Sequence, residues 1–193
     1  MKNDHLNYFF KRRSIRRFEQ IELAENVIEN CIECARLAPT GKNLQPLEYI
    51  LVTKKDIRKK LFSYIHWAGY LPKWNPSEDE QPMAYIIILY KNDDLSYYCY
   101  DVGIASAHII LYAEAKNIGS CILKNIEEKK IKELLEIPID YTVDTVIALG
   151  YKMEHPIIEE NNETTKYWHD EKKRLHVPKK SLTSILHKQT YQE

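Results

Sequence analysis

The sequence has no excess of charge of either sign, because 28 lysine and arginine residues balance 28 aspartate and glutamate residues. A balanced chain has no general field that attracts nucleic acid or an anionic membrane, so any anion site must be a local cluster. The longest apolar run, residues 84–90, is far short of the roughly 20 residues of a membrane helix. The opening residues MKNDHLNYFFKRRS lack the apolar core of a signal peptide. We therefore expect a cytoplasmic protein that binds neither nucleic acid nor membrane.

Cysteine is also sparse, and it stands only at Cys31, Cys34, Cys99 and Cys121. The first two form a C-x-x-C pair, which is typical of thiol-redox proteins when it lies at a helix N-terminus. Here the pair lies inside a helical pattern, and no second tight ligand pair completes a zinc site. We interpret the cysteines as small buried thiols. Redox chemistry at the C-x-x-C pair remains as an alternative. His169 and His176 could hold a metal, but we expect them to be exposed and unpaired, as is commoner for such histidines.

No G-x-G-x-x-G fingerprint occurs, which argues against a permanent nicotinamide site of the Rossmann type. No repeat, low-complexity tract or Gly/Ser linker divides the chain. A length of 193 residues, 44% of them hydrophobic, suits one core without disulfides or metal. We therefore predict a single domain over residues 1–193.

Apolar periodicity predicts helices over residues 22–37, 56–65, 97–117 and 127–135. Short apolar segments predict strands over residues 47–52, 84–90, 120–123 and 142–149. The helix over 97–117 is apolar nearly all round, which is typical of a central, buried helix. Residues 66–82 are expected to form an aromatic loop. After Gly150 the chain is polar with little periodicity, and we expect the tail over 150–193 to wrap a partner subunit. The alternation of elements predicts an α/β or α+β sandwich around one sheet.

Five cations fall within the seven residues Lys11–Arg17, which enclose a serine and an isoleucine. Arginine side chains match phosphate geometry with paired donors, and a serine adds another donor. A solvated helix face is the plain alternative. An RNA-binding arm is a weaker one, because no aromatic platform or second basic stripe accompanies the cluster.

Two further polar segments carry donors. Residues 38–46, A-P-T-G-K-N-L-Q-P, form a shaped loop between a predicted helix and a predicted strand. By themselves they are compatible with an ordinary connection. Residues 176–182, H-V-P-K-K-S-L, place two adjacent lysines late in the tail.

Taken together and in order, these motifs resemble the nitroreductase family of FMN-dependent NAD(P)H oxidoreductases. The resemblance runs from R-R-S-I-R through A-P-T-G-x-N-x-Q-P, D-V-G-I-A…L-Y-A-E-A-K-N-I-G-S-C and I-P…L-G-Y to the ending Y-W-H-D-E…L-H-V-P-K-K-S-L. It covers nearly the whole chain. It implies an α+β nitroreductase-like sandwich, with a central mixed sheet flanked by helices, that forms an intertwined homodimer.

The resemblance also implies an FMN site between two subunits. The phosphate would be held by Arg12, Arg13 and Ser14, with Lys179 or Lys180, and Arg16 would lie near the pyrimidine edge of the ring. The other subunit would line the ring and the ribityl chain with Pro39, Thr40, Gly41, Asn43 and Gln45. Main-chain N–H groups of Leu123, Lys124 and Asn125 would face the flavin N5.

The implied chemistry belongs to the cofactor: FMN takes electrons from NADH or NADPH, a transient donor, and passes them to a small organic acceptor such as a nitroaromatic or a quinone. One shared face predicts ping-pong kinetics, and an acceptor-selecting lid is expected in residues 66–82. A specialised relative (dehalogenase-like, flavin-destroying or peptide-oxidising) and a non-catalytic flavin-binding module are the alternatives.

Two residues depart from the family pattern. Lys124 stands where a small residue or an acid is common, and Lys180 where an arginine is common.

Overall fold

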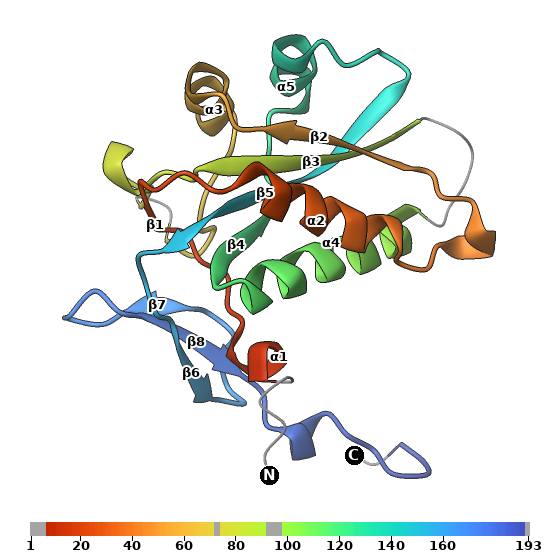
Figure 1. Ribbon diagram of the computed structural model, residues 1–193. Helices are drawn as coiled ribbons and strands as arrows, with labels where there is room; N and C mark the ends of the chain where they lie inside the picture. The colour runs from red at the N-terminus through yellow and green to blue at the C-terminus, as the bar shows by residue number, and fades with distance from the viewer. Residues whose placement is uncertain (1–6, 72–73, 92–97, 192–193) are drawn as a thin grey trace.

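The computed structural model describes residues 7–71, 74–91 and 98–191, and its centre is a five-stranded sheet (Figure 1). The long strand β5 (Tyr141–Lys152) pairs with β3 (Ala84–Lys91) on one edge and with β4 (Ile118–Leu123) on the other. Beyond β3 lies β2 (Leu47–Val52), and the short β1 (Phe18–Glu19) pairs with the last residues of β5. All four strand pairs are antiparallel.

Helices cover both faces of this sheet. On one face α2 (Glu25–Arg36) and α4 (Tyr98–Ala115) lie side by side, and on the other lie α3 (Lys55–Phe62) and α5 (Glu128–Leu135) (Figure 1). The first layer buries Ile28 and Ile109, and the second buries Leu61 and Ile131. Because both faces are covered, a central strand must be apolar throughout, and six successive residues of β3 from its start are buried.

The polar tail contains a second, three-stranded sheet, which the sequence did not predict. Strands β6 (Ile157–Glu160) and β8 (Leu175–Lys179) run parallel, and β7 (Trp168–His169) pairs antiparallel with β8. Figure 1 shows this sheet beside α1 (Asn7–Lys11), so the beginning and the end of the described chain lie close together. Single 3₁₀ turns occur at Gly41–Asn43, Glu78–Glu80 and Leu182–Ser184.

The predicted elements are confirmed with shifts of a few residues at their ends. The strand expected over 142–149 extends to Lys152, and the helix expected over 22–37 begins at Glu25. The expected helix start at residue 97 lies outside the described residues. Parallel pairing is present in the small sheet and in a single bridge between Ser14 and Ser120. The α+β sandwich is therefore confirmed.

Within the described residues no helix is both long enough and apolar enough to cross a membrane.

The cysteines are all free, and Cys31 and Cys121 are buried as expected. The same expectation is wrong for Cys99, which is exposed on the first turn of α4.

Gly119 allows the N-terminal segment to approach β4 closely, and this generates a stability prediction. A Cβ at Gly119 would lie 2.9 Å from the Cβ of Ile15, which is 2% exposed. Gly119→Ala should therefore lower the free energy of unfolding by about 1–3 kcal/mol, the usual cost of overpacking a core. The control is Gly69→Ala in an exposed turn, where nothing lies within 4 Å of the new Cβ.

We expect the Gly69 control to stabilise the protein by about 0.4–1 kcal/mol, because alanine lowers the conformational entropy of the unfolded chain. Chemical denaturation of both variants measures the difference. A Gly119→Ala protein as stable as Gly69→Ala would contradict the proposed close approach.

Candidate functional site

The basic N-terminal segment is fixed along the free edge of β4. The amide of Ile15 donates to the carbonyl of Ser120 over 2.9 Å, and Ser14 forms the parallel bridge to the same residue. Two residues further on, the carbonyl of Arg17 accepts from the amide of Met153 at 3.0 Å. Ile15 points into the core, so its charged neighbours face outward on the other side of an extended backbone.

The two late lysines reach the same region from the small sheet. Lys179 is the last residue of β8, and its carbonyl accepts from the amide of Asn161 at 2.8 Å. Lys180 follows, and the next residue, Ser181, is buried with its amide donating to Asn162 Oδ1 at 2.9 Å. Both lysines are thus held by main-chain bonds on either side.

The two segments enclose a pocket of about 400 Å³, here called the basic pocket. Its described lining residues are Arg12, Arg13, Ser14, Arg16, Tyr70, Thr165, Tyr167, Val177, Pro178, Lys179 and Lys180. None of these described residues is acidic. The structure therefore brings together all six residues that the sequence predicts around the phosphate and the pyrimidine edge.

Arg13 is the most constrained cation of the basic pocket. Its Nη2 donates to the carbonyl of Phe10 at 2.8 Å and its Nη1 to the carbonyl of Arg12. Its Nε is buried without a hydrogen-bond partner among the described residues. Burial, together with the charge of Arg12, lowers the pKa of Arg13. A buried orphan donor in a group of cations is a feature that an anionic ligand would satisfy.

Arg16 is held from two sides by residues to which the sequence patterns assigned no role. Its amide donates to Glu154 Oε1 at 2.5 Å, and burial raises the pKa of Glu154. The Arg16 guanidinium carbon lies 4.8 Å from the centroid of the Tyr167 ring, within the range of a cation–π contact. The Tyr167 hydroxyl in turn accepts from the amide of Tyr70 at 3.3 Å. Tyr167 is the first residue of the Y-W-H-D motif, but the motif alone gave it no role.

The loop over residues 39–45 lies away from the basic pocket within one chain. It connects α2 to β2 and lines a separate pocket of about 140 Å³ with Thr40 and Gln45. Its amide at Gly41 donates to the buried carboxylate of Asp101 at 2.9 Å. Left-handed backbone occurs at Lys42, Asn43 and Gln45. The remaining predicted residue of the loop, Pro39, is exposed.

The segment predicted to face N5 follows directly on β4. The carbonyl of Asn125 accepts from the amide of His66 at 2.9 Å, and the amide of Glu127 donates to the carbonyl of Tyr64 at 2.8 Å. These bonds fix the main chain around Lys124. Its side chain is turned back toward β5, where the ammonium lies 2.8 Å from Asp144 Oδ1.

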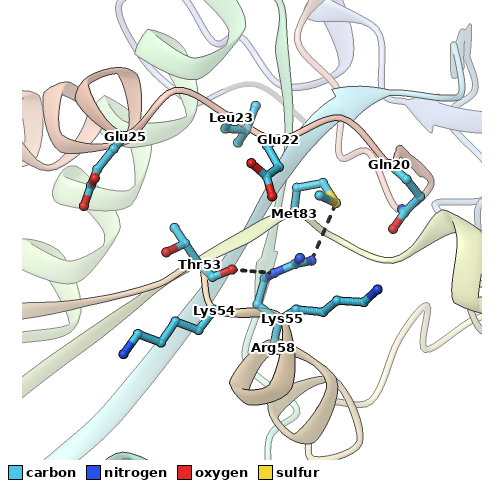
Figure 2. Close-up of a pocket in the computed structure, with 9 residues that line it drawn as sticks. All are labelled: Gln20, Glu22, Leu23, Glu25, Thr53, Lys54, Lys55, Arg58 and Met83. Carbon is cyan, nitrogen blue, oxygen red and sulfur yellow. Dashed lines mark hydrogen bonds between the residues drawn. The ribbon is translucent and has the colours of Figure 1, made fainter.

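A larger pocket of about 520 Å³ lies at the start of α3 (Figure 2). Its charges are mixed, since Glu22 and Glu25 line it together with three cations, and Figure 2 shows Lys54 and Lys55 extending in opposite directions. Arg58 is already engaged, donating to the carbonyls of Thr53 at 2.8 Å and Pro82 at 2.7 Å. Arg58 therefore links two loops and is not free to bind a ligand. Because this pocket also contains acidic residues, the basic pocket is the better site for an anion.

The thiol-redox alternative finds no support in the structure. Burial raises the pKa of Cys31 to about 12, and burial also raises the pKa of Cys34. Both residues lie within α2, away from its N-terminus. A nucleophilic thiol needs a lowered pKa, so this pair is poorly suited to disulfide exchange.

Comparison with known proteins gives one consistent result. The chain matches the model of the Nitroreductase family over residues 10–74 and 72–151. A protein of Archaeoglobus fulgidus, named as an NADH dehydrogenase/NAD(P)H nitroreductase, is 30% identical over 155 residues, which cover 76% of this chain and 84% of that protein. The iodotyrosine deiodinase of Thermotoga neapolitana is 22% identical over 160 residues, covering 73% and 84% respectively.

A solved FMN-dependent nitroreductase from Clostridium difficile R20291 superposes with a TM-score of 0.70. The two sequences are 24% identical, and the match covers 96% of this chain and 99% of that chain. That likeness extends through the small sheet to nearly the end of the chain.

The strand that carries Lys179 is anchored by His176, which the sequence pattern predicts to be exposed and unpaired. The structure corrects this, because His176 is buried between two carboxylates. Its Nδ1 contacts Glu159 Oε1 on β6, its Nε2 lies 3.2 Å from Asp170 Oδ2, and its ring stacks on Trp168 at 4.3 Å. Within the described residues no group of three or more metal-ligating side chains is assembled.

This arrangement predicts a pH-dependent stability. Hydrogen bonds to Glu159 and Asp170 raise the pKa of His176, so the folded state binds its proton more tightly than the unfolded state. Its stabilising contribution is complete below the unfolded histidine pKa of about 6.5 and is lost as pH rises through the folded pKa. His169 contributes in the opposite direction, because burial lowers its pKa.

The His176 contribution is isolated by comparing wild type with His176→Gln. Melting temperatures measured from about pH 6 to pH 9 should fall more steeply for wild type than for this variant. His155→Gln, at an exposed position, is the matched control and should follow wild type. Parallel curves for wild type and His176→Gln would refute the proposed linkage.

Proposed function

The chain belongs to the nitroreductase family, and we propose that it is an FMN-dependent oxidoreductase that passes electrons from NADH or NADPH to a small organic acceptor such as a nitroaromatic or a quinone. The observation that carries the proposal is the basic pocket. Two segments about 165 residues apart, each predicted from its motif to bind the FMN phosphate, meet around it. The likeness to the Archaeoglobus protein and to the FMN-dependent nitroreductase from Clostridium supports the class of activity.

The residues of the basic pocket fit a phosphomonoester. Arg12 and the two lysines supply positive charge, and Ser14 supplies a hydroxyl donor. The buried, unpartnered Nε of Arg13 adds a donor that no other group among the described residues satisfies. Charge-assisted hydrogen bonds of this kind are about twice as strong as neutral ones.

Arg16 is the residue best placed to act on the flavin ring. When bound, FMN would supply the two-electron chemistry that joins donor to acceptor. A fixed cation beside the ring edge would stabilise negative charge there without reorganising during the reaction. Glu154 holds the Arg16 main chain, and Tyr167 holds its guanidinium.

The Lys124 segment supplies a main-chain contact in this proposal. The ion pair with Asp144 and the bonds of its neighbours to residues 64–66 leave the backbone fixed and the ammonium engaged elsewhere. A main-chain donor depends on backbone geometry and not on side-chain charge. No protein nucleophile is needed. Because no dinucleotide fingerprint provides a separate nicotinamide site, the donor and the acceptor would share one face of the flavin and bind in turn, which is a ping-pong sequence.

A homodimer would bring the 39–45 loop to the basic pocket of a partner. Apolar side chains around this loop are exposed in the single chain: Leu37 at 67%, Leu44 at 46% and Tyr100 at 71%. Tyr100 begins a stripe on the outer side of α4 that continues through Ile104, Ala107 and Leu111 at helical spacing, and these three are half-buried. A second copy covering this face would account for the all-round apolar character of α4 and for the separation of the two halves of the site.

A dehalogenase-like activity is the second candidate. It is favoured by the likeness to an iodotyrosine deiodinase, which covers 84% of that protein. Both activities would use the same basic pocket. Product analysis with a halophenol and a nitroaromatic, each supplied with reduced FMN enzyme, separates the two.

The phosphate assignment is tested by Arg12→Ala and Lys180→Ala. Each removes a charge-assisted hydrogen bond worth about 1.5–3 kcal/mol, so FMN affinity should fall roughly 10- to 150-fold in a fluorescence titration. Riboflavin, which has no phosphate, should bind both variants as it binds wild type. Lys129→Ala, an exposed lysine on α5, controls for loss of one positive charge. Unchanged FMN affinity in both pocket variants would show that the basic pocket does not bind the FMN phosphate.

A further inference from the structure

Asp144 occupies an irregular position on the central strand. In the pairing of β3 with β5, Ile88 lies opposite Thr145 and Leu89 opposite Val143. Asp144 is therefore an extra residue in β5, a β-bulge. Bulges turn a side chain out of the regular alternation and are frequent beside functional sites.

The bulge directs the Asp144 carboxylate to the end of β4. Its Oδ1 accepts from Thr145 Oγ1 at 2.6 Å and lies 2.8 Å from the Lys124 ammonium. The Asp144 side chain is 14% exposed, whereas that of Lys124 is 63% exposed. The carboxylate is thus the fixed member of the pair, and the lysine is drawn back toward it from solvent.

The main chain of this segment does not depend on the ion pair. Bonds from His66 to Asn125 and from Glu127 to Tyr64 hold it on the far side of Lys124. Removing the Asp144 charge should therefore release the ammonium and leave the backbone in place. An asparagine in its place keeps the size of the side chain and an oxygen that can accept from Thr145.

We infer that Asp144 is a positioning residue that neutralises Lys124 beside the flavin ring and so keeps the flavin reduction potential from rising. The inference rests on the proposed function, which places residues 123–125 at N5. Two-electron reduction of bound FMN takes up one proton and leaves one negative charge on the ring, so an uncompensated cation nearby favours the reduced form. An intact ion pair has no net charge and exerts little of this effect.

The test is a set of potentiometric titrations against a reference dye on FMN-loaded protein. Asp144→Asn should raise the reduced-to-oxidised ratio at a given potential about tenfold, a midpoint higher by about 30 mV for two electrons. Lys124→Met, which leaves Asp144 uncompensated, should lower it. The double variant restores net neutrality and should return to the wild-type midpoint.

Asp140→Asn is the matched control. Asp140 precedes β5 and lies 3.5 Å from Lys91 at the end of β3, so the same substitution releases a lysine on the opposite edge of β5 from Lys124. Its midpoint should equal that of wild type. An Asp144→Asn midpoint equal to that of Asp140→Asn, or a Lys124→Met midpoint equal to wild type, would overturn the inference.

FMN affinity, measured on the same samples, separates this inference from the proposed function. All variants should bind FMN as wild type does, because the phosphate contacts are untouched. Tight FMN binding with unmoved midpoints would defeat the role of Asp144 and leave the proposed function standing. A wild-type protein that fails to bind FMN would overturn both.

Discussion

The pairing of the N-terminal segment with the edge of β4 and the end of β5 positions everything else in the site. Ile15 and Phe18 are buried by this pairing, and two glycines make room for them: a Cβ at Gly119 or Gly150 would come within 3 Å of their side chains. Once Ile15 is placed, the alternation of an extended chain directs its neighbours Ser14 and Arg16 to the opposite side. The charge cluster is thus located by hydrophobic packing.

Concentrating cations in one pocket costs electrostatic energy, which the structure offsets through nearby carboxylates outside the lining. Glu154 accepts from the Arg16 main chain, and the Glu114–Lys152 ion pair lies near Arg13, where the charge of Glu114 raises the Arg13 pKa against the larger effect of burial. The pocket surface itself stays positive. In the proposed function, an anionic cofactor would complete this balance.

The elements of the main sandwich could be predicted because each is fixed by local periodicity. β3 is continuously apolar, so its burial on two faces followed directly. α4 is apolar nearly all round, but its outer stripe is only half-buried in the single chain. The small sheet could not be predicted in this way, since β7 has two residues and β6 pairs with a strand almost twenty residues away. Its anchor, His176 between Glu159 and Asp170, is a contact that no spacing shows. The cations of the site could be predicted from motif chemistry and resemblance, whereas Glu154 and Tyr167 could not, because they meet Arg16 only through the fold.

The central claim is that FMN binds between two chains, with its phosphate in the basic pocket of one and its ring against the 39–45 loop of the other. Sedimentation velocity followed at the visible absorbance of oxidised flavin tests both halves of this claim in one experiment. The account predicts that the flavin signal sediments with a species of twice the mass of one chain. Flavin that sediments with a single chain, or that remains free in the presence of the protein, would contradict it.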